Sequence, residues 1–367
     1  IALGAISAGA RAYYSYPMTP ASSILTYLAE TSHESGMLVK QAEDEITAAQ
    51  MTLGSMHMGT RAFTGTSGGG FDLMTETISL AGIIETPIVL VLAQRPGPAT
   101  GLPTWTSAGD LNLAIHAGHG EFPRIVLSAS DFESAYSLIQ HAFDLAEKFQ
   151  TAVVLLTEKQ IAEGLYNVKD LPQDLEINRY LLTDNGQTEK AGLRRYEFTE
   201  DGISPRWLPG SDLPQYNANG DEHDEIGDVN EEALNAKLIA KKRMKKIELI
   251  KQTFPEPILY GDNDADITFV GWGSVKPVVN DIRNLLSQNN SDLKINYLHY
   301  DYLFPLKTEK LLEILKTAER PVLIENNYLG QLGHLITAET GFKFNEKLLK
   351  YDGRPFFIED ILNFINS

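Results

Sequence analysis

The chain has 367 residues, of which 43% are hydrophobic and 22% charged, a composition typical of a globular protein with room for two domains. Its net charge of −18 argues against nucleic-acid or anionic-membrane binding as the main task. These 367 residues contain no cysteine, which excludes a disulfide, a thiol nucleophile and thiolate ligands for an iron–sulfur cluster among them. Any such cluster would have to be bound by another polypeptide.

The hydropathy pattern predicts neither a membrane anchor nor a secretory signal. No apolar stretch approaches the roughly 18–20 residues of a membrane span, and the first residues lack a basic segment followed by an apolar core. We therefore expect a cytoplasmic protein with no membrane partner and no nucleic-acid partner. The sequence starts at Ile1, inside a pattern typical of a small-residue helix, so we expect further sequence upstream.

Residues 1–166 alternate between strand-like and helix-like patterns. The strands are expected at 12–16, 38–41, 61–65, 87–93 and 152–156. The helices are expected at 1–11, 21–32, 44–58, 73–82 and 132–148. Strands that alternate with helices predict an α/β fold, with a doubly wound, mostly parallel sheet covered by helices on both faces.

The pattern dissolves over residues 167–257, which we interpret as an irregular excursion and linker with one charged helix at 231–251. The segment 222–225, Glu-His-Asp-Glu, has the side chains of a metal site, but a solvated acidic loop explains it better. A second α/β domain is expected over 258–367. Its strands are expected at 266–271, 293–298 and 321–325, and its helices at 276–288, 311–318 and 330–340.

The most informative segment is 94–104, QRPGPATGLPT, which directly follows a run of apolar residues predicted to be a buried strand. Open α/β sheets bind ligands just beyond the carboxyl ends of their strands. Arg95 would therefore lie where an anion docks, on a loop that three prolines stiffen. The alternative is an ordinary surface arginine in a turn.

Three further segments follow strand patterns. In 16–20, Tyr-Pro-Met-Thr-Pro, two prolines fix the backbone beside Thr19, which could grip a carboxylate or could simply begin a helix. Glu43, Asp44 and Glu45 stand at the start of an Ala-rich helix, where the helix dipole alone could favour them. Residues 64–70 form a glycine-rich turn that would let a ligand approach backbone N–H groups.

One apparent cofactor motif is rejected. Residues 261–262 and 289–290 have the spacing of the magnesium–diphosphate motif of thiamine enzymes, GDG…NN. Here the Gly-Asp pair precedes its strand instead of following it, and Asn263 stands in place of the second glycine. We therefore expect no metal site on this chain.

Taken together, Glu45 and the segments 16–20, 66–70 and 94–104 resemble the alpha subunit of 2-oxoacid:ferredoxin oxidoreductases, and most of all the 2-oxoglutarate:acceptor type. The similarity spans the chain. It continues in order through segments 202–206, 222–225, 271–274, 325–332 and 351–356. The resemblance implies a pyrimidine-binding thiamine-diphosphate domain followed by a domain like the C-terminal domain of transketolase.

The resemblance also implies the oxidative decarboxylation of a 2-oxoacid, and 2-oxoglutarate is the expected substrate. Coenzyme A would take the acyl group and ferredoxin the electrons, so that the products are acyl-CoA, CO₂ and reduced ferredoxin. Thiamine diphosphate would lie at a subunit interface, with its aminopyrimidine ring held by this chain. The beta subunit would carry the diphosphate, its Mg²⁺ and a [4Fe–4S] cluster. Members of the family often have a gamma-type domain, which would account for sequence upstream of Ile1.

By the same resemblance, Glu45 is the catalytic glutamate that bonds N1′ of the pyrimidine and so activates the cofactor. Glu43 is its rival, and Glu45 is preferred from its placement relative to the glycines at 54 and 59. Thr66, Ser67 and Gly68 are the expected cofactor-binding neighbours.

Thr19 and Arg95 match positions that hold the substrate carboxylate, for which a bidentate guanidinium is well suited. Tyr16 is an expected neighbour of the substrate. The loop 325–332 ends a strand of the second domain, and a coenzyme A or interface role is assigned to it only as a guess.

Two alternatives remain open. The enzyme could prefer branched-chain, aryl or indole pyruvates, or the chain could be a non-catalytic assembly subunit of such a complex. The exact 2-oxoacid, the direction of flux and the quaternary state do not follow from the sequence.

Overall fold

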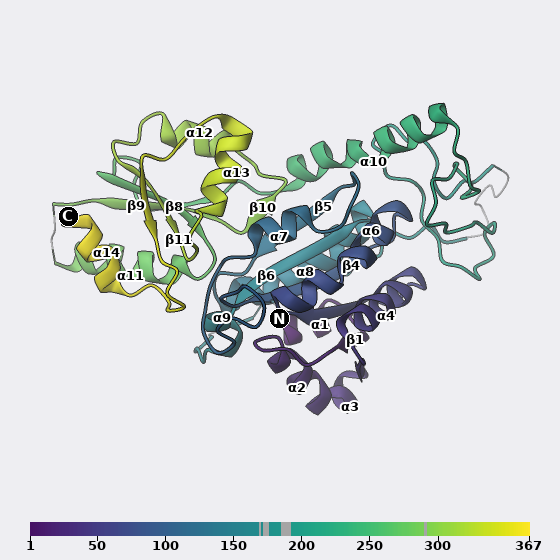
Figure 1. The fold of residues 1–367 in the computed structure, drawn as a ribbon, viewed down its shortest axis with the longest axis horizontal. Helices are drawn as coiled ribbons and strands as arrows, with labels where there is room; N and C mark the ends of the chain where they lie inside the picture. Colours follow the sequence, from purple (N-terminus) through teal and green to yellow (C-terminus); the bar gives the residue numbers. More distant parts are fainter. Residues whose placement is uncertain (169, 172–175, 185–191, 290–291) are drawn as a thin grey trace.

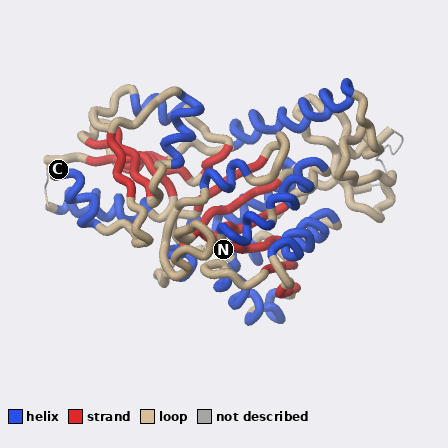
Figure 2. The backbone as a smooth tube through the Cα atoms, in the orientation of Figure 1, coloured by secondary structure: helices blue, strands red, loops and turns tan. Residues whose placement is uncertain are grey.

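The computed structural model describes residues 1–168, 170–171, 176–184, 192–289 and 292–367. These residues form two β-sheets with their helices, joined by a long segment that carries helix α10 (Figures 1 and 2). The first sheet has the strand order β10-β5-β6-β4-β3-β1-β2. Its strands are β1 Ala12–Ser15, β2 Leu38–Gln41, β3 Ala62–Thr66, β4 Ile88–Gln94, β5 Arg124–Ser128, β6 Ala152–Glu158 and β10 Tyr302–Phe304.

Helices cover both faces of this sheet. They are α1 Ala2–Ser7, α2 Ser22–Glu30, α3 Ser32–Ser35, α4 Glu45–His57, α5 Gly68–Leu73, α6 Thr75–Ile83, α7 Leu111–His116, α8 Phe132–Phe149 and α9 Lys159–Glu163. Along β4, Leu90 and Leu92 pack with the core of α5, α6 and α7, whereas Val89 and Val91 pack with the core of α1 and α8. Because neighbouring residues of a strand point to opposite faces, this alternation confirms the predicted doubly wound sheet.

Several elements of the first sheet and of its helices were not predicted. The glycine-rich turn begins a short helix, α5, instead of forming a loop. Strand β5 and helix α7 are absent from the expected elements. Most notably, β10 comes from beyond the linker and pairs antiparallel with β5, so a segment of the predicted second domain completes the edge of the first sheet.

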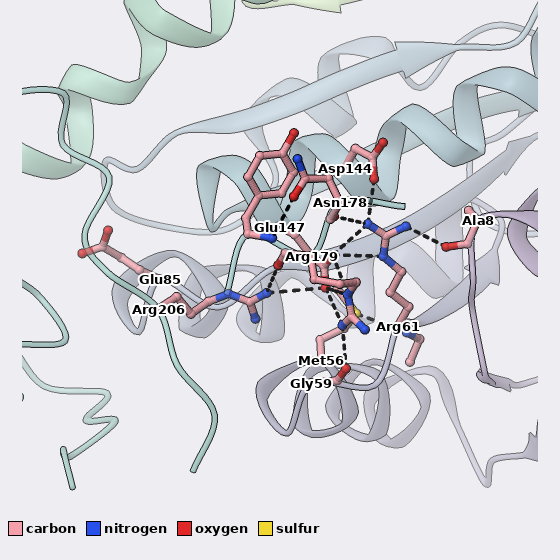
Figure 3. Close-up of polar contacts among 12 residues, drawn as sticks. Ala8, Met56, Gly59, Arg61, Glu85, Asp144, Glu147, Asn178, Arg179 and Arg206 are labelled. Atoms are coloured by element: carbon pink, nitrogen blue, oxygen red, sulfur yellow. Dashed lines mark hydrogen bonds and ion pairs between the residues drawn. The ribbon is translucent and has the colours of Figure 1, made fainter. Parts of the chain in front are cut away.

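The segment between β6 and β7 carries the long helix α10, Ala233–Thr253, which runs across the molecule toward the second sheet (Figure 1). The irregular part of this segment is anchored to the first domain by buried ion pairs. Glu147 on α8 accepts hydrogen bonds from Arg61 (Nε to Oε2, 2.9 Å), Arg179 (Nη2 to Oε1, 2.8 Å) and Arg206 (Nη2 to Oε1, 3.4 Å) (Figure 3). Glu147, Arg61 and Arg206 are almost completely buried, so this excursion is packed against the core.

A second buried cluster holds α10. Glu85 accepts from Lys242 at 2.7 Å and from Lys246 at 2.5 Å, and all three side chains are buried. Burial alone would raise the pKa of Glu85, but the two ammonium groups outweigh it and hold this pKa far below its usual range. His223, in the segment predicted to be a solvated acidic loop, is fully buried against the ring of Tyr196. That prediction is therefore wrong for His223.

The second sheet has the order β12-β11-β8-β9-β7, parallel except for β7. Its strands are β7 Ile258–Tyr260, β8 Ile267–Trp272, β9 Ile295–Tyr300, β11 Pro321–Glu325 and β12 Glu346–Leu349. Its helices are α11 Val275–Gln288, α12 Glu309–Leu315, α13 Gln331–Thr340 and α14 Ile358–Ile365. The domain boundaries 166/167 and 257/258 stay a prediction, and residue 290 of the rejected motif lies outside the described residues.

In the parts of the chain that the structure describes, no helix is both long and apolar enough to cross a membrane.

Candidate active site

The carboxyl ends of four neighbouring parallel strands, β1, β3, β4 and β6, meet at one edge of the first sheet. The segments predicted to carry the chemistry follow three of these strands, namely 16–20 after β1, 67–70 after β3 and 95–104 after β4. Such an edge is where open α/β sheets place ligands. The topology therefore brings the predicted site residues to one place.

Glu45 is the first residue of α4, whose N-cap Asp44 accepts a hydrogen bond from the N–H of Thr47 at 2.7 Å. The Glu45 side chain is buried, whereas its rival Glu43 is exposed. Within the described residues, Oε1 of Glu45 is buried without a hydrogen-bond partner. A buried carboxylate oxygen left in this state is costly, so a donor from outside the chain would be favoured there.

Gly70 on α5 keeps the space in front of Glu45 open. A Cβ atom at this position would lie 2.1 Å from Oγ1 of Thr66 and 2.6 Å from Oε1 of Glu45. Glycine is therefore required at position 70 by the close approach of α5 to α4. Thr66 and Ser67, at the end of β3, are both buried, and Oγ of Ser67 has no partner in the described parts of the chain.

Gly68 begins α5 and faces Asp110, the N-cap of α7. A Cβ atom on Gly68 would lie 3.3 Å from Oδ2 of Asp110. This oxygen is buried and lacks a hydrogen-bond partner among the described residues. Burial raises the pKa of Asp110 to about 6; Asp72 adds to this shift and Arg95 opposes it. Asp110 was not predicted as a site residue, because it follows no recognisable strand.

Arg95 and Thr19 are brought together, but through the backbone of Thr19. Nη1 of Arg95 donates to the carbonyl oxygen of Thr19 at 2.7 Å. Among the described residues, this is the only hydrogen bond that the Arg95 guanidinium makes. Thr66 also contacts the segment 16–20, since its Oγ1 lies 3.7 Å from Sδ of Met18. Tyr16 is 39% exposed at the end of β1.

Two buried polar residues at the ends of β4 and β6 were not predicted as site residues. Gln94 and Glu158 are register partners, and both are buried. Oε1 of Gln94 accepts from the N–H of Asp110 at 2.9 Å, and Glu158 accepts from the N–H and the hydroxyl of Ser274 at 2.9 and 2.6 Å. Burial raises the pKa of Glu158, and the Ser274 hydrogen bonds oppose that rise. The sequence signal that could have identified Gln94 and Glu158 is a polar residue at the end of an apolar strand.

The loop 325–332 of the second domain lies at the interface with the first domain. The carboxylate of Glu325 is fully buried and accepts from Nε1 of Trp272 at 2.9 Å and from Nδ2 of Asn327 at 2.8 Å. Asn327 also donates to the carbonyl oxygen of Ala108 at 3.0 Å. These contacts are made within the chain, between its two domains, and the coenzyme A or interface role of this loop stays a prediction.

No cluster of three or more His, Cys, Asp or Glu side chains that could hold a metal ion occurs among the residues the structure describes.

Comparisons with known proteins identify the family of the chain. A family described as pyruvate flavodoxin/ferredoxin oxidoreductase, thiamine diphosphate-binding, matches residues 3–245. The 2-oxoacid:ferredoxin oxidoreductase 1 subunit alpha of Sulfurisphaera tokodaii is 36% identical, over 98% of this chain and 59% of the relative. The 2-oxoglutarate synthase subunit KorA of Methanocaldococcus jannaschii is 33% identical, over 90% of this chain and 87% of the relative.

Among solved structures, the chain is similar to 2-oxoglutarate:ferredoxin oxidoreductase from Magnetococcus marinus with 2-oxoglutarate, coenzyme A and succinyl-CoA bound. The TM-score is 0.89 and the identity 35%, covering 100% of this chain and 63% of that one. A split-gene transketolase, described as an inactive beta4 tetramer, is similar in fold alone, with a TM-score of 0.56 and 11% identity over 100% of this chain and 95% of that chain. The expected thiamine-diphosphate-binding fold with a transketolase-like arrangement is confirmed.

The chain spans about three fifths of the length of several of these relatives. The family match nevertheless covers well over half of the chain, and relatives above 30% identity align with nearly all of it. The chain therefore belongs to the pyruvate flavodoxin/ferredoxin oxidoreductase family, among the alpha subunits of 2-oxoacid:ferredoxin oxidoreductases.

Proposed function

We propose that this chain is the alpha subunit of a thiamine-diphosphate-dependent oxidoreductase that decarboxylates 2-oxoglutarate. The products would be succinyl-CoA, CO₂ and two electrons passed to ferredoxin. The observation that carries the proposal is the buried, unpartnered Oε1 of Glu45 in front of Gly70. The family match and the names of the relatives support the cofactor and the reaction class.

The residues present fit the pyrimidine end of thiamine diphosphate. The cofactor, when bound, supplies a carbon nucleophile for the 2-oxo group. The buried Oε1 of Glu45 would share a proton with a ring nitrogen of the cofactor. Thr66, Ser67 and Gly68 would line the same space, because they connect the end of β3 to the start of α5, beside Glu45 and Gly70.

Arg95 is proposed to bind the substrate carboxylate. Its Nη1 is engaged by Thr19, which orients the guanidinium and leaves its other N–H groups for a carboxylate. Thr19 would then act through its position beside Arg95, and Tyr16 would line the entrance. The beta subunit is proposed to hold the diphosphate, Mg²⁺ and the [4Fe–4S] cluster, and coenzyme A to accept the acyl group. An upstream gamma-type domain is proposed as well.

The deciding experiment reconstitutes the complex with its beta subunit and compares Glu45→Gln with Glu43→Gln. Glu43 is the matched control, because it lies two residues away and is exposed. We expect Glu45→Gln to abolish 2-oxoacid-dependent reduction of a low-potential acceptor, with its circular dichroism spectrum unchanged, and Glu43→Gln to remain active. Near-normal turnover by Glu45→Gln would contradict the cofactor assignment.

A substrate panel then tests the 2-oxoacid. A higher kcat/KM for branched-chain, aryl or indole pyruvates than for 2-oxoglutarate would contradict the 2-oxoglutarate assignment. Calorimetric titration with thiamine diphosphate tests the assembly-subunit alternative, since a complex that fails to bind the cofactor is not the catalyst.

A further inference from the structure

The segment 105–112 of the first domain is held by the second domain through several hydrogen bonds. The N–H of Ala108 donates to the carbonyl oxygen of Asn326 at 2.9 Å, and that of Thr106 donates to the carbonyl oxygen of Gly353 at 3.2 Å. Arg354 stacks on the ring of Trp105, with its Cζ 3.2 Å from the ring centroid. Contacts with the second domain therefore help to fix the backbone conformation of segment 105–112.

Gln331 makes the contact nearest to the candidate active site. It is the first residue of α13 and is 6% exposed. Its Nε2 donates to the carbonyl oxygen of Gly109 at 2.6 Å, and its Oε1 accepts from the N–H of Asn112 at 2.8 Å. One amide thus holds the backbone on both sides of Asp110.

Asp110 is consequently fixed from two directions. Gln94, beside Arg95, holds its N–H from within the first domain, and Gln331 holds its chain neighbours from the second domain. The result is that Oδ2 of Asp110 lies against Gly68, where only glycine leaves room for it without a close contact. No donor for this oxygen is present among the described residues, and Asp72 and Arg95 are the charged groups that act on it. Contacts from both domains thus hold a buried, unpartnered carboxyl oxygen at this place, which is costly.

We propose that Gln331 is a positioning residue for the reaction on the first domain, which acts by keeping the Asp110 carboxyl against Gly68. This inference rests on the proposed function of the same site. It makes the second domain a determinant of the reaction, although the candidate catalytic residue Glu45 lies on the first. Small displacements of groups in an active site lower reaction rates by large factors, so the loss of the Gln331 amide can lower the rate of the reaction.

A double-mutant cycle in the reconstituted complex tests the proposal. The variants are Gln331→Ala, Asp110→Asn and the two together, with His334→Ala as control, because His334 is exposed one turn further along α13. We expect Gln331→Ala to lower kcat/KM roughly tenfold or more in the presence of Asp110. In the Asp110→Asn background the same change should cost less than about twofold, because a residue that acts through another has nothing left to act on. His334→Ala should match the unmodified complex.

The pH dependence of kcat/KM separates positioning from stability. The acidic limb of the kcat/KM profile should be present in the unmodified complex, displaced in Gln331→Ala and absent in Asp110→Asn.

Equal effects of Gln331→Ala with and without Asp110 would overturn the inference, as would an unchanged pH profile in Gln331→Ala. Titration with thiamine diphosphate distinguishes this failure from that of the proposed function. A complex that binds no cofactor refutes the function, whereas a complex that binds it and turns over, but gives an additive cycle, refutes only the role of Gln331.

Discussion

Asp110→Asn is expected to stabilise the chain, by an amount that grows between about pH 4 and pH 6 and is constant above that range. Burial raises the pKa of Asp110 from 3.8 to about 6 in the folded state. Between these two pH values the folded state binds more protons than the unfolded state, so the stability contributed by Asp110 falls as the pH rises through this window. At about 1.4 kcal/mol per pKa unit, the full loss is about 3 kcal/mol above pH 6. An asparagine side chain does not titrate in this range, so its contribution to the free energy of unfolding does not change with pH.

Urea unfolding followed by tryptophan fluorescence at several values between pH 4 and pH 7.5 measures this difference. The free energy of unfolding of Asp110→Asn minus that of the unmodified chain should rise by up to about 3 kcal/mol across the window and then level off. A difference that is flat with pH would refute the reasoning. Asp72→Asn provides the control, because removing this exposed carboxylate should lower the pKa of Asp110 and shrink the rise.

Three further predictions concern close contacts and buried charges. Gly70→Ala should weaken thiamine diphosphate binding at least about tenfold by calorimetry, since its Cβ would lie 2.6 Å from Oε1 of Glu45; unchanged affinity would contradict the placement of the site. Gly273→Ala should lower the free energy of unfolding by about 1–3 kcal/mol more than Gly36→Ala does. Both glycines have φ near +65°, but only at Gly273 would the added Cβ lie 2.4 Å from Oε1 of Glu158. Glu85→Gln should cost about 3–5 kcal/mol at pH 7, because it leaves the Lys242 and Lys246 ammonium groups buried without their carboxylate. Glu76→Gln, at an exposed carboxylate, is its control, and an equal effect of both would refute the buried-pair argument.

Five of the seven strands of the first sheet and the gathering of the site loops at one edge were predictable, because both follow from local patterns. Apolar runs identify buried strands, and parallel strands bring their carboxyl ends together. Arg95 could be singled out in this way, since it directly follows a recognisable strand. Glu45 could not, because the pattern alone left Glu43, Asp44 and Glu45 open and only the family resemblance favoured Glu45. The start of α5 could not, because glycine disfavours helices and only the distance from Gly70 to Glu45 shows why it is tolerated there.

Contacts between distant segments were beyond the reach of sequence patterns. Asp110 and Gln331 are 221 positions apart in the numbering, and only the docking of α13 against the 105–112 segment brings them together. His223 was misjudged for the same reason. Its acidic neighbours indicate a solvated loop, whereas its burial results from packing against Tyr196 beside the ion pairs of Glu85.

The antiparallel strand β10 has a consequence for biosynthesis. As the ribosome extends the chain, the other six strands of the first sheet emerge early, but β5 remains an unpaired edge until residues 302–304 have been made. An open edge can pair with other chains, and the wait covers more than 170 residues of translation. A truncation after the first domain would make that exposure permanent. We therefore expect such fragments to aggregate, and the nascent chain to depend on chaperones until Phe304 has been added.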